Sequence, residues 1–368
     1  MKLSEFAKEC RDTWKEDRSG VPVVGLEHLE PGEVKLSVWD VNSENTFTKR
    51  FNKGQVLLGR RRVYLRKAVV APFDGICSGD ITVIEAIPGK ILPELLPFVI
   101  QNDAFFDYAE QGSAGSLSPR VKWEHLKDFE VNLPPIDEQK VLAEKLWAAY
   151  RLKESYKKLL AATDEMVKSR FIEMFGDPMT NSKHWTDYEL LKDVTEIVLG
   201  STPNSKNPKY WDGTINWITP AELSEQSYFV YDTERHITKE GFLSANLTIM
   251  PIGTVLFSTR APIGKVAITG QEMCCNQGFK NFVCSNRLNN VFLYYTLKFK
   301  KDYLCSLGTG TTFKELSKKV IETLRIAVPP IELQNEFEQI YNQADKSGFE
   351  LRKSIENIDS VIKSLINN

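Results

Sequence analysis

Two long stretches of the chain carry apolar side chains at alternating steps of four and three residues, a pattern typical of helices that pack lengthwise on one another. One stretch begins after Pro134 and Pro135, and the other begins after Pro329 and Pro330. Each is predicted to form a helix of roughly 35 residues, or about 50–55 Å at 1.5 Å per residue. Proline is tolerated in the first turn of a helix, so both Pro-Pro pairs are interpreted as helix starts.

The two helical patterns share one register. The seam of the first consists of Leu142, Leu146, Ala149, Lys153, Tyr156, Leu160, Thr163 and Val167. The seam of the second consists of Phe337, Tyr341, Ala344, Gly348, Leu351, Ile355, Ile358, Ile362 and Leu365. The second seam begins 195 positions after the first, at Phe337 against Leu142, and keeps the same steps. The first seam is the weaker one, because Lys153 and Thr163 occupy core positions.

The shared register belongs to a repeat that covers the whole chain. Leu133–Gln139 returns as Val328–Gln334. Further segments match at similar shifts: Gly112–Ser116 with Leu307–Thr311, Asn52–Leu57 with Pro251–Leu256, Val21–Val24 with Ile215–Ile218, and Leu3–Phe6 with Leu191–Val194. The side chains between these anchors differ widely. The pattern indicates a duplicated scaffold that presents two related but different surfaces to a partner.

The order of the segments favours an antiparallel pair of helices. The first helix leads directly into the second globular region, and that region leads back to the start of the second helix. In a parallel pair, the second region would have to extend along the full length of both helices. An antiparallel coiled coil avoids this, and it predicts one globular domain at each end, related by an approximate twofold axis. The alternative is that each helix packs only on its own domain.

The regions outside the helices have a mixed pattern. Alternating β-branched runs predict strands at Val34–Trp39 and Gly253–Phe257, and longer apolar runs predict helices at Leu92–Phe106 and Val291–Leu304. The expected fold class is therefore α+β, with two mixed α/β domains in a pseudo-twofold repeat. The expected boundaries are 1–132 for the first domain, 133–177 for a central helical spacer, 178–327 for the second domain and 328–368 for a C-terminal helical spacer.

Charge and cysteine content narrow the class of protein. The formal net charge of −2 argues against a uniformly basic nucleic-acid binder, but Asn45–Phe73 contains eight basic residues and no acidic one. A protein that contacts DNA over part of its surface fits this distribution. Six cysteines without zinc-like spacing and four scattered histidines indicate reduced thiols and no metal site. Without an apolar signal core or a bilayer-length apolar run, a cytoplasmic protein is expected.

Several phrases of the sequence carry a family resemblance. They are the repeated Pro-Pro-Ile motif before each helix, Met174–Pro178 at the end of the first helix, Asn207–Gly213 followed by Trp217–Thr219, Asn276–Phe279, and Gly308–Thr312. In the order and duplication of these phrases, the chain resembles the specificity subunit of a type I restriction-modification system over essentially its whole length. The first half departs from the family pattern, because Cys77–Gly79 stands where the second half has an Asn-Gln-Gly triplet.

The resemblance implies two target recognition domains, each of which reads one half of a split DNA site. Because the two regions differ in their side chains, the full site is expected to be asymmetric. The helices are implied to set the gap between the halves and to dock two methyltransferase (modification) subunits, which bind S-adenosylmethionine and methylate adenine. Two motor-nuclease (restriction) subunits that use ATP and Mg²⁺ are implied to join for cleavage. The chain itself is expected to bind no cofactor.

The sequence contains neither the motif of an adenine methyltransferase nor the phosphate loop of an ATP-binding motor. Adenine methylation uses an Asn/Asp-Pro-Pro-Tyr/Phe motif beside a flipped base, but the Pro-Pro pairs here are flanked by Leu133 and Ile136 or by Val328 and Ile331. The sequence has no G-x-x-x-x-G-K-[ST] phosphate loop. We therefore expect a non-catalytic DNA-recognition subunit. Three alternatives stay open: a solitary methyltransferase or nuclease, a coiled-coil adaptor that binds only protein, and a half-functional or phase-variable specificity subunit.

Candidate DNA contacts are side chains that pair with base edges or with phosphates. In the first domain they are Arg60, Arg61, Arg62, Tyr64, Lys67, Ser113 and Ser116. In the second domain they are Thr259, Arg260, Lys265, Gln277, Lys280, Thr309, Thr311, Thr312 and Lys314. The two glycine-rich segments, Gly112–Ser116 and Gly308–Thr312, are also expected to bring backbone N–H groups against phosphate. The alternatives are a solvated basic hairpin and an ordinary turn before a helix.

Overall fold

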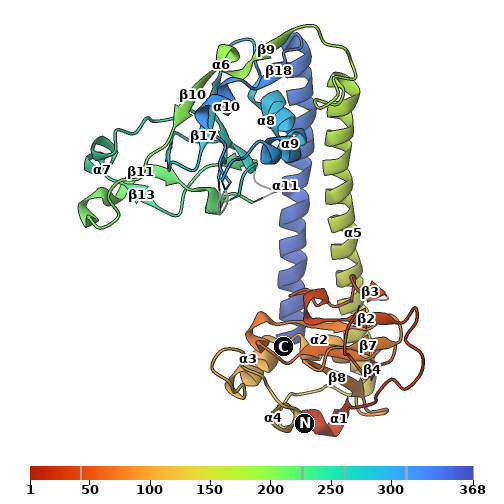
Figure 1. The fold of residues 1–368 in the computed structure, drawn as a ribbon. Coiled ribbons are helices and arrows are strands. Elements are labelled where there is room, and N and C mark those ends of the chain that lie inside the picture. Colours follow the sequence, from red (N-terminus) through yellow and green to blue (C-terminus); the bar gives the residue numbers. More distant parts are fainter. Residues whose placement is uncertain (42–43, 225–227, 261, 311–313, 368) are drawn as a thin grey trace. The chain divides into compact units, whose positions relative to one another are not determined.

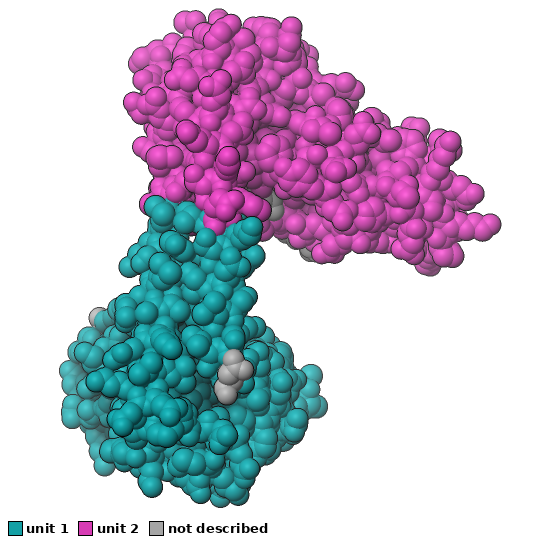
Figure 2. Space-filling view, turned by 180° about the vertical axis from the view of Figure 1, so that it is seen from behind, with its two compact units in different colours: residues 1–159, 351–368 teal, residues 160–350 magenta. Residues whose placement is uncertain are grey.

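The structure is a computed structural model that describes residues 1–41, 44–224, 228–260, 262–310 and 314–367. The chain divides into two compact units, which Figure 2 shows in two colours. Unit 1 comprises residues 1–159 and 351–368, and unit 2 comprises residues 160–350. Helices α5 (Ile136–Phe175) and α11 (Ile331–Asn367) are continuous, and each contributes to both units (Figure 1). The boundaries expected from the sequence treat these helices as separate spacers, whereas the compact units each include part of both.

Unit 1 contains two four-stranded sheets and several short helices. One sheet has the order β1-β8-β5-β6 and is antiparallel throughout, and the other has the order β3-β2-β7-β4 with a parallel β2–β7 pair. The strands are β1 (Ala7–Cys10), β2 (Pro22–Val24), β3 (Asp40–Val41), β4 (Lys49–Phe51), β5 (Val56–Gly59), β6 (Ala68–Val70), β7 (Gly75–Cys77) and β8 (Ile81–Ala86). The helices are α1 (Leu3–Phe6), η1 (Leu26–His28), η2 (Val63–Leu65), α2 (Leu96–Ile100), α3 (Asp103–Gln111) and α4 (Trp123–Leu126).

Unit 2 contains sheets of five, three and two strands. Their orders are β10-β17-β14-β15-β12, β13-β11-β16 and β18-β9. The strands are β9 (Tyr188–Leu190), β10 (Thr195–Leu199), β11 (Trp211–Ile218), β12 (Phe229–Val230), β13 (His236–Ile237), β14 (Val255–Phe257), β15 (Val266–Thr269), β16 (Cys274–Cys275), β17 (Lys280–Cys284) and β18 (Arg325–Ala327). The helices are α6 (Leu191–Val194), η3 (Pro208–Tyr210), η4 (Pro220–Glu222), α7 (Lys239–Ser244), α8 (Asn290–Phe299), α9 (Lys301–Ser306) and α10 (Lys318–Glu322).

The two units share a strand order, in agreement with the repeat in the sequence. Strands β10-β17-β14-β15 of unit 2 follow the order of β1-β8-β5-β6 in unit 1, with antiparallel pairing in both. The parallel pair β2–β7 aligns Val23 with Ile76, and its counterpart β11–β16 aligns Trp217 with Cys274. The backbone pairing is therefore duplicated even where the side chains differ.

The two long helices are built into the cores and run antiparallel within each unit. In unit 1 the first part of α5 packs with the last part of α11, so that Leu146 and Ile362 belong to one buried cluster. In unit 2 the last part of α5 packs with the first part of α11, and the Phe171 and Phe337 rings lie 5.2 Å apart. All residues of both predicted seams are buried or half-buried. Burial of this apolar stripe is what stabilises an amphipathic helix in a protein.

Lys153, the basic residue within the first seam, has a partner on the other helix. Its ammonium nitrogen lies 2.6 Å from a carboxylate oxygen of Asp359 on α11, and its side chain is only 8% exposed. A buried charge with a single complementary partner favours one register and one orientation, as polar seam residues do in other coiled coils. We infer that this position helps to fix how α5 and α11 align within unit 1.

The repeated glutamine after each Pro-Pro pair ties the start of a long helix to its domain. Gln139 donates to the carbonyl of Pro134 at 2.9 Å and accepts from the Leu92 N–H at 3.0 Å. Gln334 is fully buried and does the same in unit 2, where it accepts from the Asn289 N–H at 2.8 Å. The motif recurs because equivalent backbone groups need a partner at both helix starts.

We expect Gln334→Leu to lower the free energy of unfolding by about 2–4 kcal/mol, because it leaves buried backbone groups without hydrogen bonds. Gln139→Leu is expected to have a similar effect in unit 1. Urea unfolding of the full chain measures both. The control is Gln343→Leu on the exposed face of the same helix, which is expected to cost less than about 0.5 kcal/mol. Equal losses for Gln334→Leu and the control would contradict the anchoring role.

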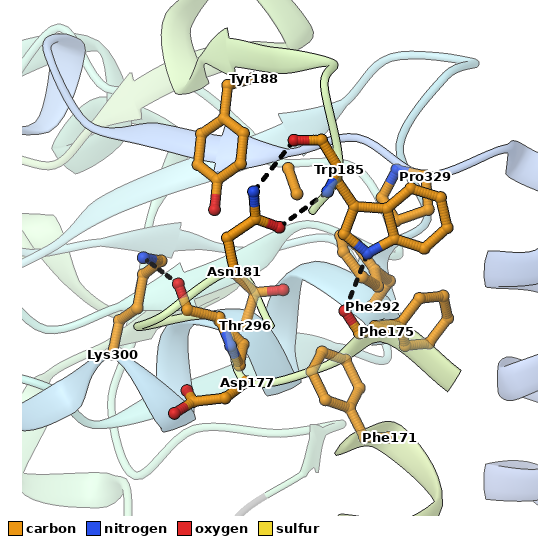
Figure 3. Close-up of a pocket in the computed structure, with 12 residues that line it drawn as sticks. Phe171, Phe175, Asp177, Asn181, Trp185, Tyr188, Phe292, Thr296, Lys300 and Pro329 are labelled. Carbon is orange, nitrogen blue, oxygen red and sulfur yellow. Dashed lines mark hydrogen bonds between the residues drawn. The ribbon is translucent and has the colours of Figure 1, made fainter. Parts of the chain in front are cut away.

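The last turn of α5 is closed by a small network of side chains (Figure 3). Gly176 follows the helix with a φ of 78°, the left-handed conformation common after helix ends. The Trp185 indole donates to the Phe175 carbonyl at 2.8 Å, and the Asn181 side chain makes two bonds to the Trp185 backbone. The cavity among these residues measures about 20 Å³, which is room for about one water molecule. This hollow therefore belongs to the helix end.

The strand expected at Val34–Trp39 is wrong. Val34 and Leu36 are buried, but only Lys35 pairs, through an isolated parallel bridge to Val70. The alternation of apolar and polar residues here reflects a loop that packs on the core, because a loop can bury every second side chain without extending a sheet. The other expected strand, Gly253–Phe257, is confirmed as β14 over Val255–Phe257.

The two expected short helices are each divided in two. Leu92–Phe106 contains α2 and the start of α3, and Val291–Leu304 contains most of α8 and the start of α9. In unit 1 the division falls at Asn102, whose side chain accepts from the Ala104 N–H at 2.7 Å and thereby caps α3. An Asn at this position favours a new helix start over continuation, because its side chain replaces a backbone partner.

Candidate nucleic-acid interface

In unit 1 the loop that leaves β5 meets the segment that follows the glycine-rich turn. Arg60 donates its backbone N–H to the Asp80 carbonyl at 2.9 Å, and its own carbonyl accepts from the Val121 N–H at 3.0 Å. The next residue, Arg61, forms an isolated antiparallel bridge with Arg120. We call these five residues, with Ser118, the junction of unit 1.

In unit 2 the loop that leaves β14 makes the same contacts. Thr259 donates its N–H to the Gly278 carbonyl at 2.8 Å, and its carbonyl accepts from the Leu316 N–H at 3.0 Å. Arg260 forms an isolated antiparallel bridge with Glu315. These five residues, with Lys280, form the junction of unit 2. In each unit the structure thus joins the predicted loop to a residue that follows the glycine-rich turn, and that residue also pairs with the turn, Arg120 with Ala114 and Glu315 with Thr309.

The junction of unit 1 is a cationic group organised around one carboxylate. Arg120 donates to both oxygens of Asp80, at 2.6 and 3.0 Å, and Arg61 lies 3.8 Å from the same carboxylate. Arg61 also donates to the Ser118 hydroxyl at 3.0 Å. The hydrogen bonds from Arg120 hold the pKa of Asp80 below its usual range. The positive charge of Arg60 also lies close enough to act on this carboxylate, so basic groups outnumber the acidic one and the junction attracts anions.

The junction of unit 2 has the opposite internal arrangement. Here the buried group is a base: the Lys280 ammonium donates to the Thr259 hydroxyl at 3.0 Å and lies 3.4 Å from Glu315. Burial lowers the pKa of Lys280 below its usual value. Lys280 is 6% exposed and Thr259 is fully buried. The sequence predicted both as direct DNA contacts, but their burial assigns them to the support of the loop.

The remaining candidate side chains of unit 1 differ in how exposed they are and in whether they bind within the domain. Arg62 is exposed in a left-handed conformation, with a φ of 53°, and Tyr64 is 47% exposed. Lys67 is half-buried and donates to the Leu26 carbonyl at 2.8 Å, so it is engaged within the domain. In the glycine-rich turn, Ser113 donates back to the Ala109 carbonyl at 3.2 Å, whereas Ser116 is exposed.

The remaining candidates of unit 2 are mostly at the surface. Gln277, Thr309 and Lys314 are exposed, and Gln277 accepts a hydrogen bond from the Thr202 hydroxyl. Lys265 is half-buried and donates to the Pro220 carbonyl at 2.9 Å, which ties it to the domain. The two other candidates, Thr311 and Thr312, lie outside the described residues.

The basic stretch Asn45–Phe73 is not a single surface segment. It passes through β4, β5 and β6, and several of its cations have partners within the unit. Arg66 pairs with Asp103 and with Asp107, the latter at 2.7 Å, and the Lys49 ammonium donates to the Ile81 carbonyl at 2.8 Å. These cations are therefore engaged within the unit, and the stretch is not a continuous basic surface.

Sequence reasoning missed Asp80, Arg120 and Glu315. A signal was present, because Arg120 and Glu315 lie 195 positions apart, the shift of the repeat, just after the two glycine-rich segments. Leu117 was also missed; it is 88% exposed beside the junction of unit 1. An exposed leucine among arginines suits contact with bases, since apolar side chains insert between base steps in some complexes.

The part of the chain that the structure describes contains no group of three or more His, Cys, Asp or Glu residues placed to hold a metal ion. Within those same residues, no helix is long and apolar enough to cross a membrane.

Comparison with known proteins assigns the chain to a family. The family model described as "Type I restriction modification DNA specificity domain" matches residues 8–162 and again residues 183–358. The chain belongs to the type I restriction-modification DNA specificity family. The two matches coincide with the two copies of the repeat, so each copy corresponds to one specificity domain.

Relatives and solved structures of specificity subunits agree with this assignment. The chain is 34% identical over 208 residues to the type I restriction enzyme MjaIX specificity subunit of Methanocaldococcus jannaschii, a match that spans 55% of this chain and 48% of that relative. It is 22% identical to the putative MjaX specificity subunit of the same organism, over 95% of this chain and 86% of the relative. The solved type I S subunit from M. genitalium matches the whole chain and 94% of its own length with a TM-score of 0.60 at 12% identity, which shows a shared fold.

Proposed function

We propose that this specificity chain reads a split, asymmetric DNA site, with one half-site for each unit. The observation that carries this proposal is the duplicated junction: the same backbone contacts recur in both units, but the side chains and the sign of the supporting charge, Asp80 or Lys280, differ. Direct readout depends on which donors and acceptors a protein presents in a DNA groove. Two junctions with equal frames and unequal side chains therefore suit two different half-sites.

We propose that α5 and α11 set the gap between the half-sites and dock two methyltransferase subunits. Leu152, Leu159 and Met166 recur every seven residues along α5 and are 45%, 52% and 52% exposed. A heptad stripe of exposed apolar residues on a helix favours packing of a further helix from a partner. This stripe is separate from the seam residues, which are buried or half-buried.

We propose that the chain contributes recognition and no catalysis. The Pro-Pro pairs, which could be mistaken for part of a methyltransferase motif, are helix starts anchored by Gln139 and Gln334. S-adenosylmethionine would be held by the methyltransferase subunits, and ATP with Mg²⁺ by two motor-nuclease subunits in the full complex. The relative named as a type I restriction enzyme specificity subunit supports a role within such an assembly.

The test is to assemble the chain with its methyltransferase subunits and map the methylated adenines across a genome. We expect one bipartite, asymmetric sequence with a fixed gap. Methylation without a preferred sequence would contradict the proposal. Binding of S-adenosylmethionine by the isolated chain would favour a solitary enzyme. If the assembly showed no salt-dependent binding to DNA, the chain would instead be an adaptor that binds only protein.

Arg61→Ala tests whether the junction of unit 1 contacts a base or a phosphate. If Arg61 reads a base edge, we expect the preference at one base pair to fall by about 1–3 kcal/mol, with other positions unchanged. Competitive binding to duplexes that differ at single positions measures this. A uniform loss of affinity for all duplexes would instead identify a phosphate contact.

A further inference from the structure

Arg120 and Glu315 occupy one equivalent position in the two junctions. Each pairs through its backbone with a residue of the loop that leaves a strand, Arg61 after β5 in unit 1 and Arg260 after β14 in unit 2. Their side chains are similarly open, with 42% of Arg120 and 44% of Glu315 exposed. One position of the duplicated scaffold therefore carries opposite charges in the two units.

Arg120 is held so that one end of its guanidinium group stays open. Asp80 accepts from Nε at 2.6 Å and from Nη2 at 3.0 Å, which engages one edge of the plane. The contact from Nη1 to the Ser118 carbonyl is long, at 3.4 Å. The end formed by Nη1 and Nη2 thus retains N–H groups for a second partner, and its fork geometry matches a bidentate acceptor.

Glu315 is held in a corresponding way, but here the exposed group is the acid and the group that holds it is the base. Its Oε1 lies 3.4 Å from the ammonium of Lys280, which is itself fixed by the Thr259 hydroxyl at 3.0 Å. The side chain of Lys280 is 8% exposed, so the base lies beneath the carboxylate and away from solvent. The exposed part of Glu315 presents carboxylate oxygen, which accepts hydrogen bonds and donates none.

We propose that Arg120 and Glu315 are specificity-determining residues that read the two half-sites with opposite hydrogen-bond polarity. Arg120 presents only donors and selects guanine through O6 and N7. Glu315 presents only acceptors and selects a base amino group, with N4 of cytosine as its ordinary partner. Asp80 and Lys280 are positioning residues that orient them. This inference rests on the proposed function, that each unit reads DNA.

Conservative substitutions in the full chain, assembled with its methyltransferase subunits, test the inference by selection from a randomised duplex library. Arg120→Lys keeps the charge but removes the planar fork. Glu315→Gln keeps the shape but replaces one acceptor by a donor. We expect Arg120→Lys to lower the preference for its base at one position by roughly 5- to 150-fold, the range for a bidentate contact. We expect Glu315→Gln to lower its preference by roughly 10- to 150-fold, the range for one hydrogen bond to a charged group. The other half-site should remain unchanged.

Asp80→Asn adds a test of positioning, because it leaves Arg120 in place but removes the carboxylate that orients it. We expect the guanine preference to weaken while the other positions of that half-site keep theirs. Arg18→Lys and Glu196→Gln are matched controls, since both residues are exposed and lie outside the junctions. These controls should leave every position unchanged.

Two results would overturn the inference. One is a wild-type base preference that persists in both Arg120→Lys and Glu315→Gln. The other is an equal loss of affinity for all sequences in these variants, which is the result of a phosphate contact or of a structural ion pair. Either result, with a bipartite site still selected by the wild-type chain, rejects the inference alone. A wild-type assembly that selects no bipartite site rejects the proposed function itself.

Discussion

Inserting four residues into both α5 and α11 is expected to move the methylated site to a gap about two base pairs longer and to abolish methylation at the original site. Four helical residues add about 6 Å, and base pairs are about 3.4 Å apart. The insertions are placed where one compact unit ends and the other begins, between Leu159 and Leu160 and between Glu350 and Leu351. Each unit then keeps its own internal contacts. Mapping of methylated adenines measures the gap.

Two further insertion variants test whether the helices set the gap. A seven-residue insertion in both helices adds one heptad, keeps the seam register and is expected to lengthen the gap by about 10 Å or three base pairs. The same four residues inserted into the exposed turn at Asp17–Gly20 should leave the gap unchanged. An unaltered gap in folded helix-insertion variants would reject the role of the helices as a spacer.

Phe171→Ala is expected to lower the stability of unit 2 by about 3–5 kcal/mol, the usual cost of truncating a buried phenylalanine. Phe171 is fully buried near the end of α5. Its ring lies 5.3 Å from that of Phe299 and 5.2 Å from that of Phe337, and it stacks on Phe292 at 5.6 Å. The substitution therefore removes one of the residues through which α5 packs on α8 and α11 in unit 2.

Hydrogen exchange measured on individual peptides of the chain distinguishes this local effect from general destabilisation. Peptides from α8 and from residues 160–175 should exchange faster in Phe171→Ala, while those of residues 1–130 keep their rates. Phe349→Ala is the matched control in the same unit, because Phe349 is 58% exposed. It is expected to change stability by less than about 0.5 kcal/mol. Similar exchange for the two variants would contradict the assigned role of Phe171.

The long helices could be predicted from the sequence because their signal is periodic and lengthy. The four-three pattern from Leu142 and from Phe337 specifies a buried stripe, and the repeat fixes a common register. The same pattern could not reveal the partner of Lys153, since Asp359 lies on the other helix more than two hundred residues away in the chain. It also could not show that Gln139 and Gln334 anchor their helices through backbone groups of distant loops.

The candidate site was predictable in its segments and not in its individual contacts. Charge and glycine patterns indicated the loop at Arg60–Arg62 and the turn at Gly112–Ser116, and the structure joins these segments through Arg61 and Arg120. Thr259 and Lys280 were expected at the DNA surface but are buried. Residue type predicts the chemistry that a side chain offers, whereas exposure depends on the neighbours that the fold supplies.

The sequence by itself determined a duplicated α+β chain with two paired helices, and it offered candidate segments for DNA contact in each copy. These features depend on local periodicity and on the repeat, both of which are written along the chain. The tertiary structure alone decided that Asp80 supports Arg120 in one junction and that Lys280 supports Glu315 in the other. The physical reason is that hydrogen bonds and ion pairs act over a few ångströms in space, and folding brings together residues that the sequence separates.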